Sequence, residues 1–158
     1  MLYYKTGDIV EAQEDIVVNA ANGICWMGGI LSRIWKFSGI SECINYATRG
    51  KIEKEMRKDF KIRKPGQVFF TNGYGIGKIG MIHAVTMLLP GTRSSEDTIQ
   101  QLLPAIMKLA EEKGAHSVAM PFMGCGTGKL NKDRVKKIYD RFFCLYAGKL
   151  DVYIYDLK

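Results

Sequence analysis

The chain has 158 residues, of which 47% are hydrophobic. This is enough for one domain with a hydrophobic core and leaves little room for a second domain. No stretch approaches the roughly 20 apolar residues of a membrane helix, and the N-terminus lacks the apolar segment of a secretory signal. Lys and Arg number 23 against 16 Asp and Glu, a net charge of +7 that favours anionic partners without distinguishing nucleotide, RNA and DNA. We therefore expect a single cytoplasmic domain with no membrane partner.

The cysteines and the clusters of basic residues exclude few classes of function. The cysteines are widely spaced and form no C-x-x-C pair, which argues against a zinc site or a thioredoxin motif and predicts reduced thiols and no bound metal. They are Cys25, Cys43, Cys125 and Cys144. Much of the positive charge lies in residues 51–64 and 129–137, where alternation with apolar residues is typical of solvated helix faces first and of binding surfaces second.

Short β-branched or aromatic runs alternate with longer helical stretches, a pattern typical of α/β layers. In the first half, we predict strands over residues 2–5 and 16–19, helices over 30–38 and 41–58 joined at Gly39, and strands over 68–71 and 81–85 around a glycine-rich turn.

The second half continues the same alternation. Ser94 or Ser95 is predicted to cap a helix that runs to about Lys113 and ends at Gly114. Pro104 falls inside this helix at a cost of about 3 kcal/mol, so either the helix kinks or its regular part begins near residue 103. A strand over 117–122, a helix over 133–146 and a final strand over 151–155 complete the prediction.

The strongest local signal is an apolar strand, residues 15–23, that ends in small residues and the amides of Asn19 and Asn22. Ligands of α/β sheets bind at strand ends, but asparagine side chains also form hydrogen bonds with the backbone of turns. Both interpretations stay open. Shortly after it, Gly28-Gly29-Ile30 leads into a predicted helix. Backbone amides without hydrogen-bond partners at the start of a helix can bind a phosphate, although two glycines before a helix are also common in ordinary turns.

A second glycine-rich loop follows the predicted strand over 117–122. Its three alternating glycines, residues 124, 126 and 128, let the backbone approach an anion closely. Met123 and Leu130 stand where a P-loop requires glycine and Ser or Thr, which excludes that motif, and the spacing does not fit a dinucleotide fingerprint. Two phosphate-type loops at two strand ends indicate a diphosphate ligand.

Taken in order, these landmarks resemble the macro domain family over nearly the whole chain. They are Gly7-Asp8-Ile9, Val18 to Asn22, Gly28-Gly29-Ile30, Ile82 to Val85, and Met120-Pro121 with the loop Gly124 to Gly128. The resemblance implies a single domain over residues 1–158, a three-layer α/β/α macro domain with a central mixed sheet. It also implies a ligand, ADP-ribose, either free or attached to a protein or nucleic acid, and no cofactor.

The resemblance also assigns roles to particular residues. Asp8 would accept the adenine amino group with Ile9 flanking the ring, and Asn22 would contact the distal ribose. The first phosphate loop would be Gly28, Gly29 and Ile30, and the second Gly124, Cys125, Gly126, Thr127 and Gly128. Tyr155 either stacks near the adenine or is an ordinary strand residue. His83 is expected to be packed in its strand, and Cys125 to line the ligand without acting as a nucleophile.

Catalytic groups of active relatives are absent at the aligned positions. Hydrolases acting on acidic side chains carry an aspartate where Leu31 stands. The terminal ADP-ribose hydrolases and bacterial antitoxin relatives are the class that this chain resembles most in length and in sequence motifs. They carry a lysine and an aspartate where Met87 and Gly128 stand. Leucine and methionine cannot transfer a proton. Any turnover would therefore rest on Asn22 and on the substrate's own phosphate to orient water.

Three functions follow as alternatives. The chain is a reader of ADP-ribose without turnover, a hydrolase of ADP-ribosyl esters, ADP-ribose 1″-phosphate or O-acetyl-ADP-ribose, or a nucleic-acid binder. The last is supported by the net charge of +7 but lacks an evident exposed aromatic series. Arg33, Lys129 and Asp133 are nearby charged candidates for an unfamiliar site, and we expect each to be a surface charge.

Overall fold

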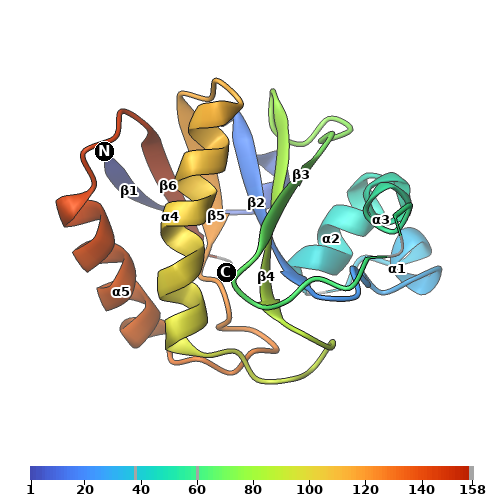
Figure 1. Cartoon of the computed structure of the whole chain (residues 1–158). Helices are drawn as coiled ribbons and strands as arrows, with labels where there is room; N and C mark the ends of the chain where they lie inside the picture. Colours follow the sequence, from blue (N-terminus) through green and yellow to red (C-terminus); the bar gives the residue numbers. More distant parts are fainter. Residues whose placement is uncertain (38, 60, 157–158) are drawn as a thin grey trace.

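A mixed six-stranded sheet forms the centre of the molecule, in the order β1-β6-β5-β2-β4-β3 (Figure 1). The structure is a computed structural model that describes residues 1–37, 39–59 and 61–156. All neighbouring strands are parallel except β3, which runs antiparallel to β4. The strands are β1 (Leu2–Thr6), β2 (Ile16–Asn22), β3 (Val68–Thr71), β4 (Gly80–Met87), β5 (Ser117–Pro121) and β6 (Asp151–Asp156).

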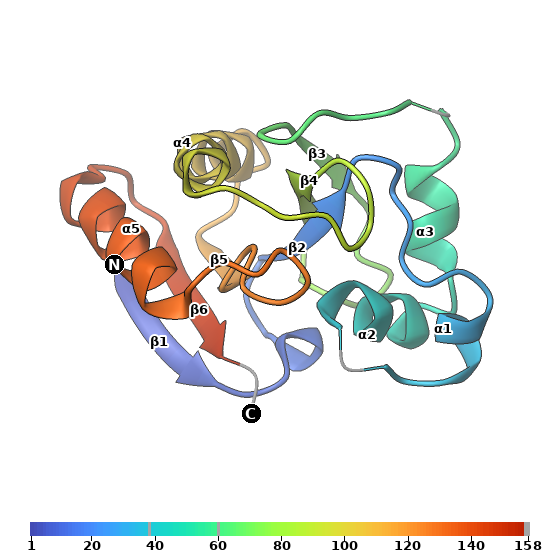
Figure 2. The same cartoon turned by 90° about the horizontal axis from the view of Figure 1, so that it is seen from below.

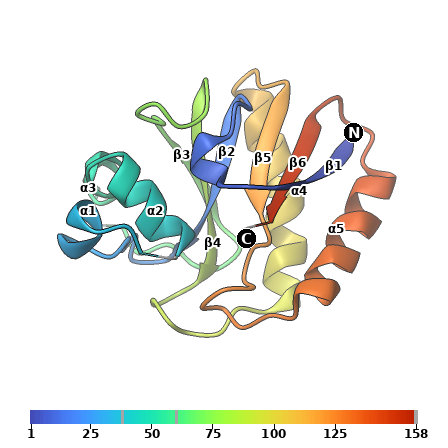
Figure 3. The same cartoon turned by 180° about the vertical axis from the view of Figure 1, so that it is seen from behind.

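Helices cover both faces of this sheet, which confirms the predicted three layers (Figures 1 and 3). One face carries the long helices α4 (Glu96–Glu112) and α5 (Lys132–Leu145). The other carries the 3-10 helix η1 (Ile9–Glu11) and the short helices α1 (Leu31–Ile34), α2 (Ile40–Ala47) and α3 (Lys51–Met56). No helix in these described residues has the length and apolarity that crossing a bilayer requires.

Strand β2 is buried on both faces because it lies between β5 and β4 and is covered by helices on either side. Ile16 and Val18 pack into the core beneath α4 and α5, whereas Val17 packs into the second core with residues of α2 and α3. Burial on both faces explains why this strand is a continuous apolar run in the sequence. The buried strand carries Asn19 and Asn22 to one end of the sheet.

The predicted helices over 30–38 and 41–58 are shorter in the structure. The first covers only Leu31–Ile34, and Trp35 is already extended at φ −118° and ψ 136°; Ser38 lies outside the described residues. The second is split into α2 and α3 because Arg49 and Gly50 take left-handed backbone angles, φ 51° and 78°. Left-handed residues end an α-helix, and Gly50 does so at no steric cost.

Pro104 does not shorten α4, so the alternative that the regular helix begins near residue 103 is wrong. The helix is assigned continuously from Glu96, with Ser95 accepting a hydrogen bond from the Thr98 amide at 3.1 Å. Pro104 lies on the exposed side of α4, where water can take up the carbonyl that proline leaves without a helical partner. The predicted stop at Gly114 is confirmed.

Candidate functional site

A cavity of about 370 Å³ opens at the carboxyl ends of β2, β4, β5 and β6. Figure 2 views the molecule from this end, with the loops after β4 and β5 and the start of α2 in the foreground. Three segments form most of its wall: residues 20–22, 39–42 and 124–128. The strand ends that the sequence singled out therefore meet at one place, as the geometry of parallel sheets requires.

The second glycine loop lines this cavity with all five of its predicted residues. The loop is closed by hydrogen bonds from the Leu130 amide to the Gly124 carbonyl at 2.9 Å and from the Ser94 amide to the Gly128 carbonyl at 3.1 Å. A β-carbon at Gly128 would lie only 2.6 Å from the Gly124 oxygen, but one at Gly126 would meet nothing within 4 Å. Gly128 is thus needed for loop closure, whereas Gly126 leaves open space where a ligand can approach.

Asn22 lines the cavity and also fixes the turn that follows β2. Its side-chain nitrogen donates to the Trp26 carbonyl at 2.7 Å, and its side-chain oxygen accepts from the Trp26 amide at 3.0 Å. Both ends of the Asn22 amide are therefore used within the loop, in agreement with the turn interpretation. The same bonds bring Trp26 to the cavity wall. The contact of Asn22 with a ribose stays a prediction.

The first glycine loop lies beside the cavity and does not line it. Gly28 and Gly29 take left-handed angles, φ 95° and 61°. Ser32 ties the loop to α1 by donating to the carbonyls of Met27 at 2.7 Å and of Gly29 at 3.0 Å. The sequence predicted that Gly28, Gly29 and Ile30 form this part of the site. In the structure, the start of α2, residues 39–42, lines the cavity there instead. Leu31, also off the cavity, is 56% exposed on α1.

A buried network that sequence reasoning missed holds this first loop in place. The Glu53 carboxylate, 1% exposed, accepts from the Met27 amide at 3.2 Å and from the Asn45 side chain at 3.0 Å. The same Asn45 nitrogen lies 2.7 Å from the Ser32 hydroxyl. Arg33 lies 3.6 Å from the carboxylate, so this candidate site residue serves as an ion-pair partner. The loop is therefore fixed by a carboxylate on α3, a distant element in the sequence.

Asp8 and Ile9, the predicted adenine contacts, also lie off the cavity. Ile9 is 1% exposed and belongs to the core. Asp8 caps η1 by accepting from the Val10 amide at 3.0 Å, and it pairs with Lys36 at 2.9 Å. Partial burial acts to raise the pKa of Asp8, but the hydrogen bonds from Lys36 and Val10 outweigh it and lower that pKa below its ordinary value.

A second buried network connects the centre of the sheet to the start of α2. His83 is fully buried, with Nδ1 3.1 Å from the Asn19 amide and Nε2 2.7 Å from the Thr71 hydroxyl. Ser41 donates to the Asn19 side-chain oxygen at 2.9 Å and lines the cavity. Burial lowers the pKa of His83 to about 3, so the ring is neutral and structural, as the sequence indicated.

Three ionisable side chains on the cavity wall were not identified from the sequence: Glu42, Lys132 and Asp156. Lys132 forms an ion pair with Asp156. Glu42, in the first turn of α2, is half-buried and lies against Gly39 and Gly28. Only structure could find these groups, because they come from three elements that are distant in sequence.

The remaining predicted residues divide between the cavity and the surface. Tyr155 lines the cavity and donates to Glu14 at 3.1 Å. Burial raises the pKa of Cys125 to about 11, so its thiol stays protonated and is no ready nucleophile. Met87 lines the cavity as well. Lys129 and Asp133 are exposed, and each is a surface charge as expected.

Comparison with known proteins adds to this description. Residues 18–139 match the family model of the macro domain. An uncharacterized protein of Aeropyrum pernix is 30% identical over 154 residues, which are 98% of this chain and 76% of that protein. The macrodomain of Mycobacterium tuberculosis DarG matches with a TM-score of 0.76 at 22% identity, over 98% of this chain and 97% of that one. The Trypanosoma brucei macrodomain in complex with ADP-ribose matches with a TM-score of 0.70 at 19% identity, over 98% of this chain and 63% of that one.

The fold and the cavity define a three-layer α/β domain with a ligand-sized site at the strand ends. The solved structures share this fold. With the family match over most of its length, the chain belongs to the macro domain family.

Proposed function

We propose that this chain binds ADP-ribose in the cavity at the carboxyl ends of β2, β4, β5 and β6. The observation that carries the proposal is the second glycine loop, whose Gly126 faces open space at the end of a buried strand. Backbone amides at such a position attract a diphosphate. The Trypanosoma brucei macrodomain, which shares the fold, forms a complex with ADP-ribose, and this supports the same ligand class here.

The cavity suggests an orientation for this ligand. The diphosphate lies against residues 124–128, the adenine near Tyr155, and the distal ribose toward Asn22 and Trp26, all of which line the cavity. A contact of Asp8 with the adenine requires the ion pair with Lys36 to open. Gly28, Gly29 and Ile30 reach a phosphate only if the loop shifts toward the cavity.

Calorimetric titration with ADP-ribose, ADP, AMP and a short oligonucleotide tests the proposal. Because adenine, diphosphate and distal ribose each have a proposed contact, ADP-ribose should bind more tightly than ADP or AMP. Gly126→Ala and Gly126→Val form a graded series, since a β-carbon at this position meets no protein atom within 4 Å and Gly126 has no left-handed φ. Affinity should fall from glycine through alanine to valine while circular dichroism stays unchanged. A folded valine variant with normal affinity shows that the loop is no phosphate site.

A second candidate function, hydrolysis of ADP-ribosyl esters or of ADP-ribose 1″-phosphate, is favoured by Glu42. This carboxylate lies on the wall of the same cavity, where a general base for an attacking water is needed. It supplies a proton acceptor that Leu31 and Met87 lack. An enzyme of this kind positions its water between Glu42, Asn22 and the substrate's phosphate.

Glu42→Gln separates the enzyme from the reader. It should abolish release of ADP-ribose from an ADP-ribosylated peptide. It should leave ADP-ribose affinity equal or higher, because a negative charge is removed near the diphosphate. If the wild type releases no ADP-ribose from Asp-, Glu- or Ser-linked substrates, even at high protein concentration, the chain is a reader. Full turnover in the Gln variant excludes Glu42 as the base.

A further inference from the structure

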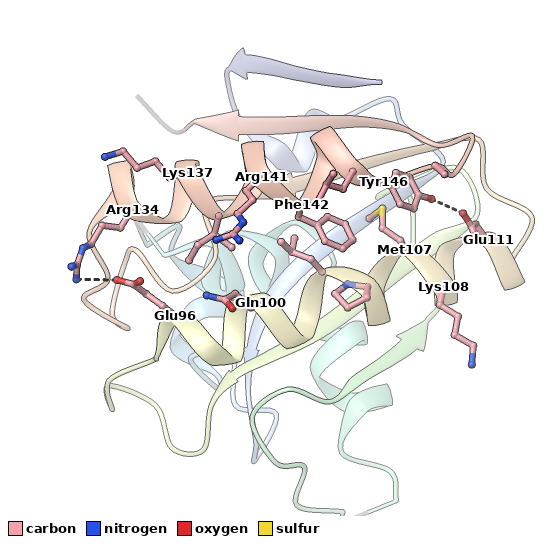
Figure 4. A pocket seen from close by; sticks show the side chains of 15 residues that line it. Glu96, Gln100, Met107, Lys108, Glu111, Arg134, Lys137, Arg141, Phe142 and Tyr146 are labelled. Atoms are coloured by element: carbon pink, nitrogen blue, oxygen red, sulfur yellow. Dashed lines mark hydrogen bonds and ion pairs between the residues drawn. The ribbon is translucent and has the colours of Figure 1, made fainter.

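A second and larger cavity, of about 960 Å³, lies between α4 and α5 on the outer side of the helical layer (Figure 4). Pro104 of α4 and Phe142 of α5 present apolar side chains to it, whereas Leu103 and Met107, 0% and 2% exposed, lie buried beneath. Leu145, at the far end of α5, is 80% exposed, which is unusual for a leucine without a partner. The hollow is an open groove with an apolar floor, separate from the cavity at the strand ends.

One wall of this groove is basic. Arg134, Lys137 and Arg141 follow each other along α5 at helical spacing and line the groove, as Figure 4 shows. Arg134 pairs with Glu96 at 3.0 Å. No carboxylate among the described residues forms an ion pair with Lys137 or Arg141. The middle of the groove thus offers two cations beside an apolar floor.

The groove is elongated. It extends from Glu96 and Arg134 at the helix starts to Glu111 and Tyr146 at their ends (Figure 4). At 1.5 Å per residue, the stretch of α4 from Glu96 to Glu111 is about 22 Å long, or roughly four helical turns. An occupant that fills such a groove is itself a rod, which points to a helix more than to a compact metabolite.

We propose that this groove binds an acidic amphipathic helix of a partner protein. The apolar stripe of that helix would lie on Pro104, Phe142 and Leu145, and its Asp or Glu side chains would face Lys137 and Arg141. Helices that lay an apolar face into a hydrophobic groove are a common mode of recognition. Charge complementarity fixes their direction and register.

The same observations disfavour other occupants. A second copy of the chain would bring together two molecules that each carry a net charge of +7 and so repel each other. Single-stranded nucleic acid needs free aromatic faces, but Phe142 and Tyr146 stack on each other at 5.8 Å. A bilayer surface meets protruding apolar side chains and cannot fill a groove between two helices.

Fluorescence anisotropy with a labelled designed peptide of about 16 residues tests the proposal. The peptide carries leucine at every third or fourth position and glutamate along one side of that stripe. It should bind, whereas a scrambled peptide and one with lysine in place of glutamate should not. Lys137→Glu combined with Arg141→Glu should weaken binding by roughly tenfold or more. Leu145→Asp, at an exposed position, should also weaken it without unfolding the protein.

Lys54→Glu combined with Lys58→Glu is the matched control, because both lysines are exposed and lie on or just after α3, on the other side of the molecule. It should leave peptide binding unchanged. Equal loss in this variant, or equal binding of the lysine peptide, overturns the proposal. Anionic vesicles and a single-stranded oligonucleotide serve as competitors, and displacement of the peptide by either in a Lys137- and Arg141-dependent manner also overturns it. ADP-ribose affinity should not change in the double variant of Lys137 and Arg141.

Discussion

Removal of the Glu53 side chain should destabilise the protein and disturb the first glycine loop together. Glu53 is 1% exposed and accepts hydrogen bonds from the Met27 amide and the Asn45 side chain. Glu53→Ala leaves these donors without their carboxylate. A hydrogen bond to a charged group contributes about 1.5 to 3 kcal/mol, but Asn45 keeps its bond to Ser32 and so loses less than the full value.

The two arginines next to Glu53 change this estimate little. Arg33 and Arg57 lie 3.6 and 3.9 Å from the carboxylate, and their side chains are 41% and 56% exposed, so water rehydrates both when the carboxylate is removed. We therefore expect Glu53→Ala to cost about 3 kcal/mol in the free energy of unfolding, at the lower end of the roughly 3 to 5 kcal/mol that follows when a fully buried pair is broken. For a chain of this size, about 3 kcal/mol lowers Tm by roughly 6 to 12 °C.

Thermal unfolding measures the loss of stability in Glu53→Ala. Calorimetric titration with ADP-ribose measures separately whether the disturbed loop changes ligand binding. Glu53→Gln should cost less, because glutamine still accepts one of the two hydrogen bonds. Glu112→Ala on α4 is the control, since Glu112 is 56% exposed and its contact with Lys108 is 4.0 Å long. If Glu53→Ala melts within a degree or so of Glu112→Ala, the network does not hold the loop, and the reasoning from burial and hydrogen bonds is refuted.

Three further predictions concern single residues. Asp8→Asn should lower stability at neutral pH, because Lys36 stabilises only the ionised carboxylate of Asp8. The difference should shrink as pH falls below 3.8, the ordinary carboxyl pKa, and vanish below the lowered pKa of the folded chain, which unfolding curves of both proteins at a series of acid pH values test. His83 has a pKa of about 3 in the folded chain against 6.5 unfolded, so stability should fall as pH drops between these values, and His83→Gln should flatten that part of the pH profile. Asn22→Ala should release Trp26 from the cavity wall, which appears as a change in tryptophan fluorescence together with weaker ADP-ribose binding, whereas unchanged fluorescence contradicts the turn assignment.

Local patterns predicted the fold because each one has a local cause. Alternation and β-branched runs marked the strands, and capping and left-handed glycine predicted the helix start at Ser94 or Ser95, which is Ser95 in the structure, and the stop at Gly114. The same rule was missed at Gly50, whose left-handed angle divides the predicted helix over 41–58. A glycine within a helical pattern is a visible signal, and here it marked a helix end.

The candidate site was only partly predictable, because its walls come from contacts distant in sequence. Gly124 to Gly128 could be placed at a strand end from sequence alone. Whether the first glycine loop or residues 39–42 reaches the cavity depends on how α1 and α2 pack, and that depends on Glu53 and Asn45, which no motif marks. Likewise, nothing in the sequence around Glu42 indicates that its carboxylate lies on the cavity wall.

The charges of the cavity lead to a last prediction, on salt. Among the described residues, the charged side chains on its wall are the cation Lys132 and the carboxylates of Glu42 and Asp156, and Lys132 is already paired with Asp156. A diphosphate bound as proposed would therefore gain little from side-chain charge and would be held mainly by backbone amides of the glycine loop. Such contacts lie in a partly buried site, where salt screens weakly. ADP-ribose affinity should change by less than about tenfold between roughly 50 and 500 mM salt, whereas binding of nucleic acid to the basic surface should fall by orders of magnitude. Calorimetry across this range decides between the two, and a steep loss of ADP-ribose affinity would mean that surface cations, and not the glycine loop, carry the binding.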